Sequence, residues 1–189
     1  MPAKSAAERA PETAAPKADF IDATALIALV PMRPYDAIGE FGCGQGHLTI
    51  PLARYAHSGR IYAIDSGQKA LDTLQERAQQ AHLSNIETVL SKESSVPLDD
   101  GKLDGAVVAD MLCDANRPKS VLKEVHRLLR KGGWLAVIAW AKTEGKQNGT
   151  GPAPRKSPDE VLELAAETGF RKLSARPLNG ERYLLVLRK

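Results

Sequence analysis

A glycine cluster led by an acid is the first feature of the chain that could do chemistry. It spans Glu40 to Gly46 (E-F-G-C-G-Q-G), between a predicted strand over 35–41 and a predicted helix over 45–56. Glycines let a backbone turn tightly and pass close to a ligand, and N–H groups at the start of a helix can bind it. In the dinucleotide-binding pattern the third glycine comes one residue later, and the loop cradles a pyrophosphate. Here Glu40 suits a cationic ligand group, although a tight turn without a ligand would use the same glycines.

A second acid, Asp65, follows about twenty residues later, at the end of the next predicted strand over 60–64. Doubly wound folds use an acid at this place to bind the ribose hydroxyls of a nucleotide. Asp65, or the neighbouring Ser66, could also be the N-cap of the helix predicted over 67–81. The two roles are compatible, so Asp65 is a candidate ribose ligand.

These candidates lie at the ends of predicted strands that alternate with helices. Helices are predicted over 18–30, 45–56, 67–81, 118–130 and 157–168, and strands over 35–41, 60–64, 86–90, 103–109 and 134–140. This alternation indicates a parallel sheet with right-handed crossovers. Two last strands, over 171–177 and 181–188, flank Asn179-Gly180, a dipeptide that favours a hairpin turn. We therefore predict an α/β fold with one doubly wound, mostly parallel seven-stranded sheet that ends in an antiparallel hairpin.

Length and composition limit the classes of protein. The chain has 189 residues, enough for the core of one domain, which we place at 18–189 after a predicted disordered tail over 1–17. The net charge of +3, without a basic cluster, gives no support for a nucleic-acid partner. No apolar run approaches the length of a membrane span. Cys43 and Cys113 form neither a disulfide framework nor a metal site, so we expect a cytoplasmic protein without a bound metal.

Four ordered motifs resemble those of class I S-adenosylmethionine-dependent methyltransferases. Residues 38–46 and 60–65 are similar to the first two motifs, 90–104 to the adenine-contacting stretch, and 128–133 to the helix end before strand five. The resemblance is nearest to the small ubiquinone/menaquinone-biosynthesis-like (methyltransferase type 11) group. It implies a Rossmann-like class I methyltransferase fold, terminal hairpin included. It also implies an enzyme that binds S-adenosylmethionine and releases S-adenosylhomocysteine.

The resemblance also implies a role for each matching residue. Glu40 would approach the methionine amino group through water, Asp65 would bind both ribose hydroxyls, and Glu93 or its backbone would face the adenine. Asp110, just after the fourth parallel strand, would lie near the methionine end of the cofactor and the opening for the acceptor. The implied cofactor-binding set is Glu40, Gly42, Gly44, Gly46, Asp65, Ser66, Glu93 and Asp110.

Methyl transfer by in-line displacement depends mainly on the alignment of donor and acceptor. A general base is needed only where the acceptor must lose a proton, and the two candidates are Asp110 and His47. Cys43 is interpreted as a packed thiol in a tight loop. The catalytic residues are otherwise not identified by the sequence.

The acceptor is the open question. Relatives often carry an aromatic residue and a His-Glu pair after strand four, where this chain has 110–114 (D-M-L-C-D). Arg155 could bind an anionic substrate group or hold its own loop in place. A small-molecule acceptor is predicted, because no Asn-Pro-Pro-aromatic sequence and no basic stripe are present. Two alternatives remain: a non-catalytic methyltransferase-like binding or scaffold domain, and a nicotinamide-dependent oxidoreductase. The sequence does not indicate the oligomeric state.

Overall fold

The computed structural model describes residues 21–91, 95–114, 118–141, 155–178 and 182–189. The predicted tail, Glu93 and the Asn179-Gly180 turn lie outside these residues. Within the described part, no helix is long and apolar enough to cross a membrane.

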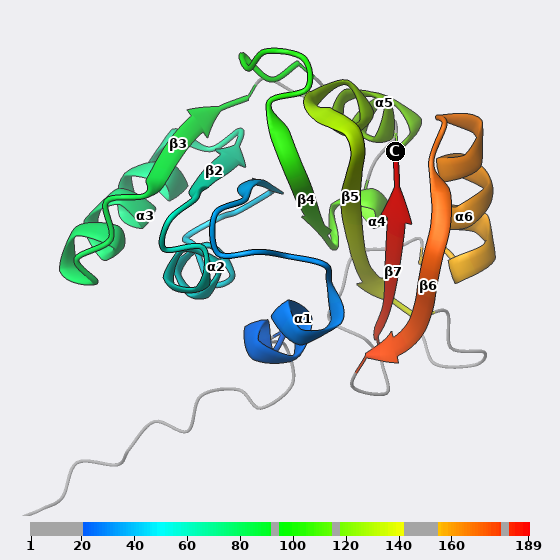
Figure 1. Ribbon diagram of the computed structural model, residues 1–189, viewed down its shortest axis with the longest axis horizontal. Coiled ribbons are helices and arrows are strands. Elements are labelled where there is room, and N and C mark those ends of the chain that lie inside the picture. Colours follow the sequence, from blue (N-terminus) through cyan, green and yellow to red (C-terminus); the bar gives the residue numbers. More distant parts are fainter. Residues whose placement is uncertain (1–20, 92–94, 115–117, 142–154, 179–181) are drawn as a thin grey trace, which may run out of the picture.

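Seven strands form one sheet in the order β3-β2-β1-β4-β5-β7-β6 (Figure 1). They are β1 (Ala37–Phe41), β2 (Arg60–Asp65), β3 (Ile86–Leu90), β4 (Leu103–Ala109), β5 (Leu129–Trp140), β6 (Arg171–Leu178) and β7 (Arg182–Arg188). The first five strands pair in parallel, and β7 runs antiparallel to both β5 and β6. The predicted fold class is confirmed. The order of strands reverses between β1 and β4, which is where open α/β sheets bind ligands.

Six helices accompany the sheet among the described residues. They are α1 (Ala23–Leu29), α2 (Thr49–Tyr55), α3 (Gln68–Gln80), α4 (Met111–Asp114), α5 (Pro118–Leu128) and α6 (Pro158–Glu167). Asp22 caps α1 by accepting from the N–H groups of Thr24 and Ala25. The predicted capping box of Ser157 and Glu160 begins α6.

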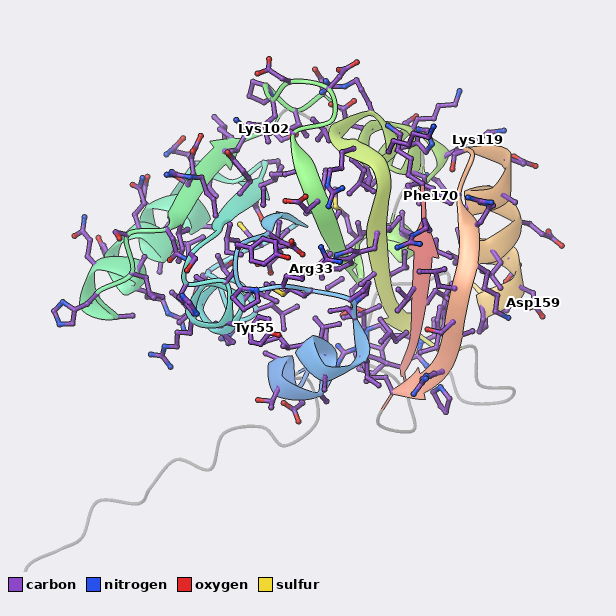
Figure 2. The ribbon with its side chains drawn as sticks, viewed as in Figure 1. Arg33, Tyr55, Lys102, Lys119, Asp159 and Phe170 are labelled. Carbon is purple, nitrogen blue, oxygen red and sulfur yellow. The ribbon has the colours of Figure 1, made fainter. Side chains whose placement is uncertain are left out.

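Side chains of each strand alternate between two cores, one on each face of the sheet. The core under α1 and α2 contains Leu26, Leu52, Ile38, Ile61, Ile138 and Val186. The core under α5 and α6 contains Leu122, Val161, Val108, Val137 and Leu185. Lys119 of α5, labelled in Figure 2, pairs with Glu167 of α6, and both side chains are about half exposed. Both faces of the central strands are therefore covered, as the near-continuous apolar run of β4 predicts.

Several local features differ from the prediction. Helix α2 begins at Thr49 and not at Gln45, because the chain runs through turns over 42–48, which we name the glycine loop. The N-cap of α3 is Gly67, with no side-chain cap, so neither Asp65 nor Ser66 has that role. The short helix α4 and the early start of β5 at Leu129 were not predicted.

Candidate cofactor and acceptor site

The glycine loop is fixed between strand β2 and helix α3. The backbone N–H groups of Gly42 and Cys43 both donate to the Ile64 carbonyl, at 2.9 and 3.2 Å. Gly46 has a φ of +85°, and a Cβ atom there would lie 2.3 Å from Cδ1 of Leu74 in α3. A residue with a side chain at this position would be strained in its backbone and would also force the buried Leu74 side chain to move.

Asp65 joins the glycine loop to the start of α3. Its Oδ2 accepts from the Gly44 N–H and its Oδ1 from the Gly67 N–H, each at 2.8 Å. A carboxylate offers about four lone-pair sites, so both oxygens keep a position for a further donor such as a ribose hydroxyl. The carboxylate is thus held in one orientation by two backbone groups before any ligand arrives.

A pocket of about 220 Å³ opens beside this carboxylate, at the carboxyl ends of the parallel strands. Three of the residues predicted to bind the cofactor line it: Gly42, Asp65 and the exposed Ser66. The remaining lining residues were not singled out from the sequence: Phe41, Ile64, Ser91 and Met111. The signal that could have found them is position, because each stands at a strand end or just after one.

Glu40 is buried at the end of β1, where only 3% of the residue is exposed. The Thr49 hydroxyl donates to its Oε2 at 2.6 Å. Burial raises the pKa of this carboxyl to about 8, with a further contribution from the negative charge of Asp65 and an opposing one from the Thr49 hydrogen bond. The free protein near neutral pH therefore holds Glu40 largely protonated, and a cationic ligand group nearby would favour its ionised form.

The described residues fit a nucleoside with a cationic amino-acid tail. Asp65 has lone pairs for two hydroxyl groups. Glu40 is an acid on the neighbouring strand, but it is buried and does not itself line the pocket. Gly44 has a φ of +53°, and no atom lies within 4 Å of the place where its Cβ would be, so this side of the loop is open to a ligand. Glu93, the residue predicted to face the adenine, lies outside the described residues.

A second polar cluster adjoins the pocket at the same edge of the sheet. Asp110 follows β4, and its Oδ2 accepts from Nη2 of Arg182, the first residue of β7, at 2.9 Å. The Arg182 guanidinium also lies 3.9 Å from the ring centroid of Trp140, the last residue of β5. The next residue after Asp110, Met111, lines the pocket. Sequence reasoning missed Arg182 and Trp140, although an arginine at the start of a buried apolar strand is itself unusual.

The other predicted residues are placed less close to the pocket. His47 is exposed in the glycine loop and does not line the pocket. Cys43 is buried, and burial together with the charges of Glu40 and Asp65 raises the pKa of its thiol, so the thiol stays protonated. Arg155 donates to the Ala141 carbonyl at 3.3 Å, next to the end of β5, a contact that is compatible with both of the roles predicted for it.

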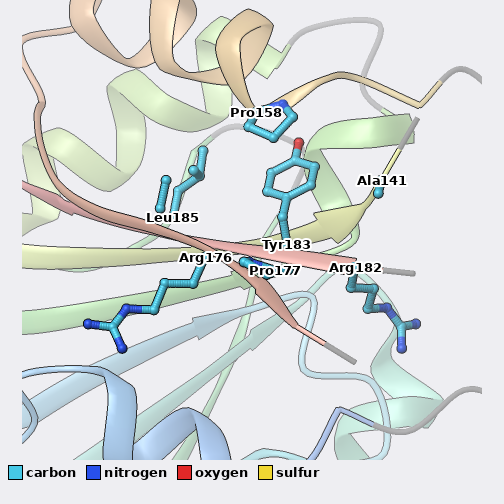
Figure 3. Close-up of a pocket in the computed structure, with 8 residues that line it drawn as sticks. Ala141, Pro158, Arg176, Pro177, Arg182, Tyr183 and Leu185 are labelled. Atoms are coloured by element: carbon cyan, nitrogen blue, oxygen red, sulfur yellow. The ribbon is translucent and has the colours of Figure 1, made fainter. Parts of the chain in front are cut away.

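A further hollow of about 340 Å³ lies between α6 and the β6–β7 pair (Figure 3). Its wall is largely apolar and includes Pro158, Pro177, Tyr183 and Leu185. In Figure 3 the Tyr183 ring points toward Pro158, whereas the Arg182 side chain extends the other way. Arg176 and Arg182 also line this hollow, and the guanidinium of Arg182 donates to Asp110.

The fold and the strand-end pocket define a Rossmann-like methyltransferase architecture, and comparison with known proteins gives the family. Residues 39–137, more than half of the chain, match the methyltransferase-domain family of type 11, so the chain belongs to that family. S-adenosylmethionine is the cofactor that this family implies.

Individual relatives agree with this assignment. The chain is 27% identical to rice (Oryza sativa) 24-methylenesterol C-methyltransferase 2, over 77% of the chain and 44% of that protein. It is 27% identical to 2-phytyl-1,4-naphtoquinone methyltransferase of Nostoc, over 61% of the chain and 51% of that protein. The chain thus spans about half the length of these curated relatives, or less. A methyltransferase structure from Aquifex aeolicus superposes with a TM-score of 0.82 at 22% identity, with 89% of each chain covered, and this likeness concerns the fold.

Proposed function

We propose that this protein is an S-adenosylmethionine-dependent methyltransferase that transfers a methyl group to a small-molecule acceptor by in-line displacement. The observation that carries the proposal is the Asp65 carboxylate, which two backbone N–H groups orient at the mouth of the strand-end pocket. When bound, S-adenosylmethionine supplies a methyl group on a positively charged sulfur, and a lone pair of the acceptor displaces S-adenosylhomocysteine from it. A glycine loop alone would give weak support for cofactor binding. The glycine loop, the oriented Asp65 carboxylate and the adjacent pocket together give stronger support.

The residues of the pocket would bind and orient the cofactor. Asp65 accepts from the ribose hydroxyls, with the Ser66 hydroxyl beside it. The resemblance to the family implies that Glu93 or its backbone would face the adenine. Gly42, Gly44 and Gly46 shape the loop along which the cofactor lies. Glu40 ionises when the cationic amino group approaches and balances its charge.

The acceptor is the less defined half of the proposal. The two relatives named above methylate, by their names, a sterol and a naphthoquinone, which supports a small molecule here as well. Asp110 would lie between the methionine end of the cofactor and the acceptor. Neither Asp110 nor His47 is required as a general base unless the acceptor must lose a proton.

Calorimetric titration of the full chain tests the proposal. We expect S-adenosylhomocysteine and S-adenosylmethionine to bind in the micromolar range, roughly 8 kcal/mol, and NAD not to bind. Binding of NAD alone would favour the oxidoreductase alternative. Failure of both methionine-derived ligands would favour the non-catalytic binding or scaffold domain, and so would overturn the proposal.

A further inference from the structure

The turn from strand β4 into helix α4 forms part of the cofactor pocket. Met111, the first residue of α4, lines this pocket. Its side chain also lies against the glycine loop, because a Cβ atom at Gly42 would be 3.6 Å from the Met111 Sδ atom. The shape of the pocket on this side therefore depends on the direction in which the chain leaves β4.

Asp110, the one residue between β4 and α4, has an unusual backbone conformation. Its φ of +55° lies in the left-handed region, where a residue with a Cβ atom is strained unless surrounding contacts hold it. His82 is the other non-glycine residue with a positive φ in the described part of the chain. It follows the C-cap of α3, where a left-handed residue is common. The conformation of Asp110 has no such local reason, so it must be enforced from outside this turn.

Two contacts with the next strands of the sheet hold Asp110. Its backbone N–H donates to the Ile138 carbonyl of β5 at 2.8 Å, and its Oδ2 accepts from Nη2 of Arg182 at 2.9 Å. The Arg182 side chain is only 4% exposed, and its guanidinium packs on the Trp140 ring at 3.9 Å from the centroid. The arginine is therefore a fixed anchor. It belongs to β7, two strands away from β4 in the sheet.

We propose that Arg182 is a positioning residue for the cofactor: it holds Asp110 in the left-handed conformation and so keeps Met111 in the wall of the cofactor pocket. Arg182 does not line this pocket itself. Without the arginine, the turn after β4 would relax toward unstrained backbone angles, and the free protein would have the pocket formed for only part of the time. The apparent affinity for the cofactor falls by that fraction. This inference rests on the proposed function, because it concerns the affinity for the proposed cofactor.

Calorimetric titration of the full chain with S-adenosylhomocysteine tests the inference. Arg182→Leu should weaken binding about fivefold or more, the size of left-handed backbone strain that is no longer enforced. Lys119→Leu is the control, because it breaks the exposed Lys119–Glu167 pair between α5 and α6, and its affinity should equal that of the parent. An Arg182→Leu variant with the affinity of the parent would overturn the inference.

Two substitutions at Asp110 separate positioning from a general loss of stability. Asp110→Gly and Asp110→Ala both remove the carboxylate, but only glycine adopts a φ of +55° without strain. We expect Asp110→Ala to bind S-adenosylhomocysteine about fivefold more weakly than Asp110→Gly. When Arg182→Leu is added to Asp110→Gly, the affinity should change less than about twofold, because no strained residue is left for the arginine to hold. Equal affinities of the two Asp110 variants, or an equal effect of Arg182→Leu with and without Asp110→Gly, would overturn the inference.

The double variant also keeps the test valid if Arg182→Leu alone does not fold, since it contains no Asp110 carboxylate that has lost its arginine. A thermal melt of each variant reports folding independently of affinity. A parent chain that does not bind S-adenosylhomocysteine would overturn the proposed function, and this inference with it. A parent chain that binds, together with variants that do not differ from it, would overturn this inference alone.

Discussion

The cofactor end and the acceptor end of the sheet are built in different ways. At the cofactor end, the glycine loop and Asp65 come from residues 40–67, and backbone N–H groups make most of the contacts. At the end where we propose that the acceptor binds, Asp110 follows β4, Trp140 ends β5 and Arg182 begins β7, and side-chain charge holds them together. Contacts made by backbone groups depend little on the identity of the side chains around them, whereas a side-chain cluster can be altered by a single substitution.

The largest expected effect is at Gly46, in the glycine loop at the cofactor end. Gly46→Ala should lower the free energy of unfolding by about 3 kcal/mol, from left-handed strain and from overpacking against Leu74. Urea denaturation followed by circular dichroism measures the loss. Gly132→Ala is the matched control, because Gly132 also has a positive φ (+76°) but no atom within 4 Å of its Cβ position. It should lose only about 1 kcal/mol, and equal losses would contradict the packing argument.

Asp65→Ala should weaken S-adenosylhomocysteine binding about 100-fold with the fold intact. The substitution removes the carboxylate that we propose accepts hydrogen bonds from the ribose hydroxyls. Calorimetric titration and a thermal melt give the two readouts. Asp72→Ala removes an exposed carboxylate from the adjacent helix α3, and its affinity should match that of the parent. Unchanged affinity in Asp65→Ala would remove the ribose assignment.

Arg182→Leu probes the acceptor end. We expect a loss of about 2 kcal/mol in the free energy of unfolding, because Asp110 loses its buried partner. Lys119→Leu breaks the Lys119–Glu167 pair, in which both side chains are about half exposed, and should cost less than about 1 kcal/mol. A similar loss in both variants would show that the Arg182 pair is no more than a surface ion pair.

The smallest expected effect is the pH dependence that Glu40 gives to stability. The pKa of Glu40 in the folded protein, about 8, lies above the ordinary value of 4.5 for a glutamic acid, so the folded protein holds a proton that the unfolded chain releases between these two pH values. This contribution to stability is complete below pH 4.5 and is lost as the pH rises toward 8. Between pH 6 and 7 the loss should be about 1 kcal/mol. Urea denaturation at the two pH values should show a flatter dependence in Glu40→Gln, and an equal slope would argue against the buried proton.

The order of elements followed from the sequence because it depends on local periodicity and turn residues. Strands β3 and β4 have the predicted bounds, and the N-cap and capping box of α6 were read from Ser157 and Glu160. The glycine loop and Asp65 were also accessible, since both belong to a short segment of chain. The predicted start of α2 was wrong because Gly42, Gly44 and Gly46 adopt left-handed φ angles, which keep the chain out of a helix. Glycine permits this conformation but does not require it, so the sequence alone did not indicate it.

Tertiary structure alone decided the remaining features. Asp110 and Arg182 are 72 positions apart, and they meet only because the strand order β4-β5-β7 brings the end of one strand near the start of another. The raised pKa of Glu40 depends on how completely the sheet and α2 exclude water from it. The sequence by itself determined which residue types could bind a cofactor and in which strands, helices and loops they lie. Burial, charge pairing and the meeting of distant strands, which are properties of the packed chain, decided what surrounds them.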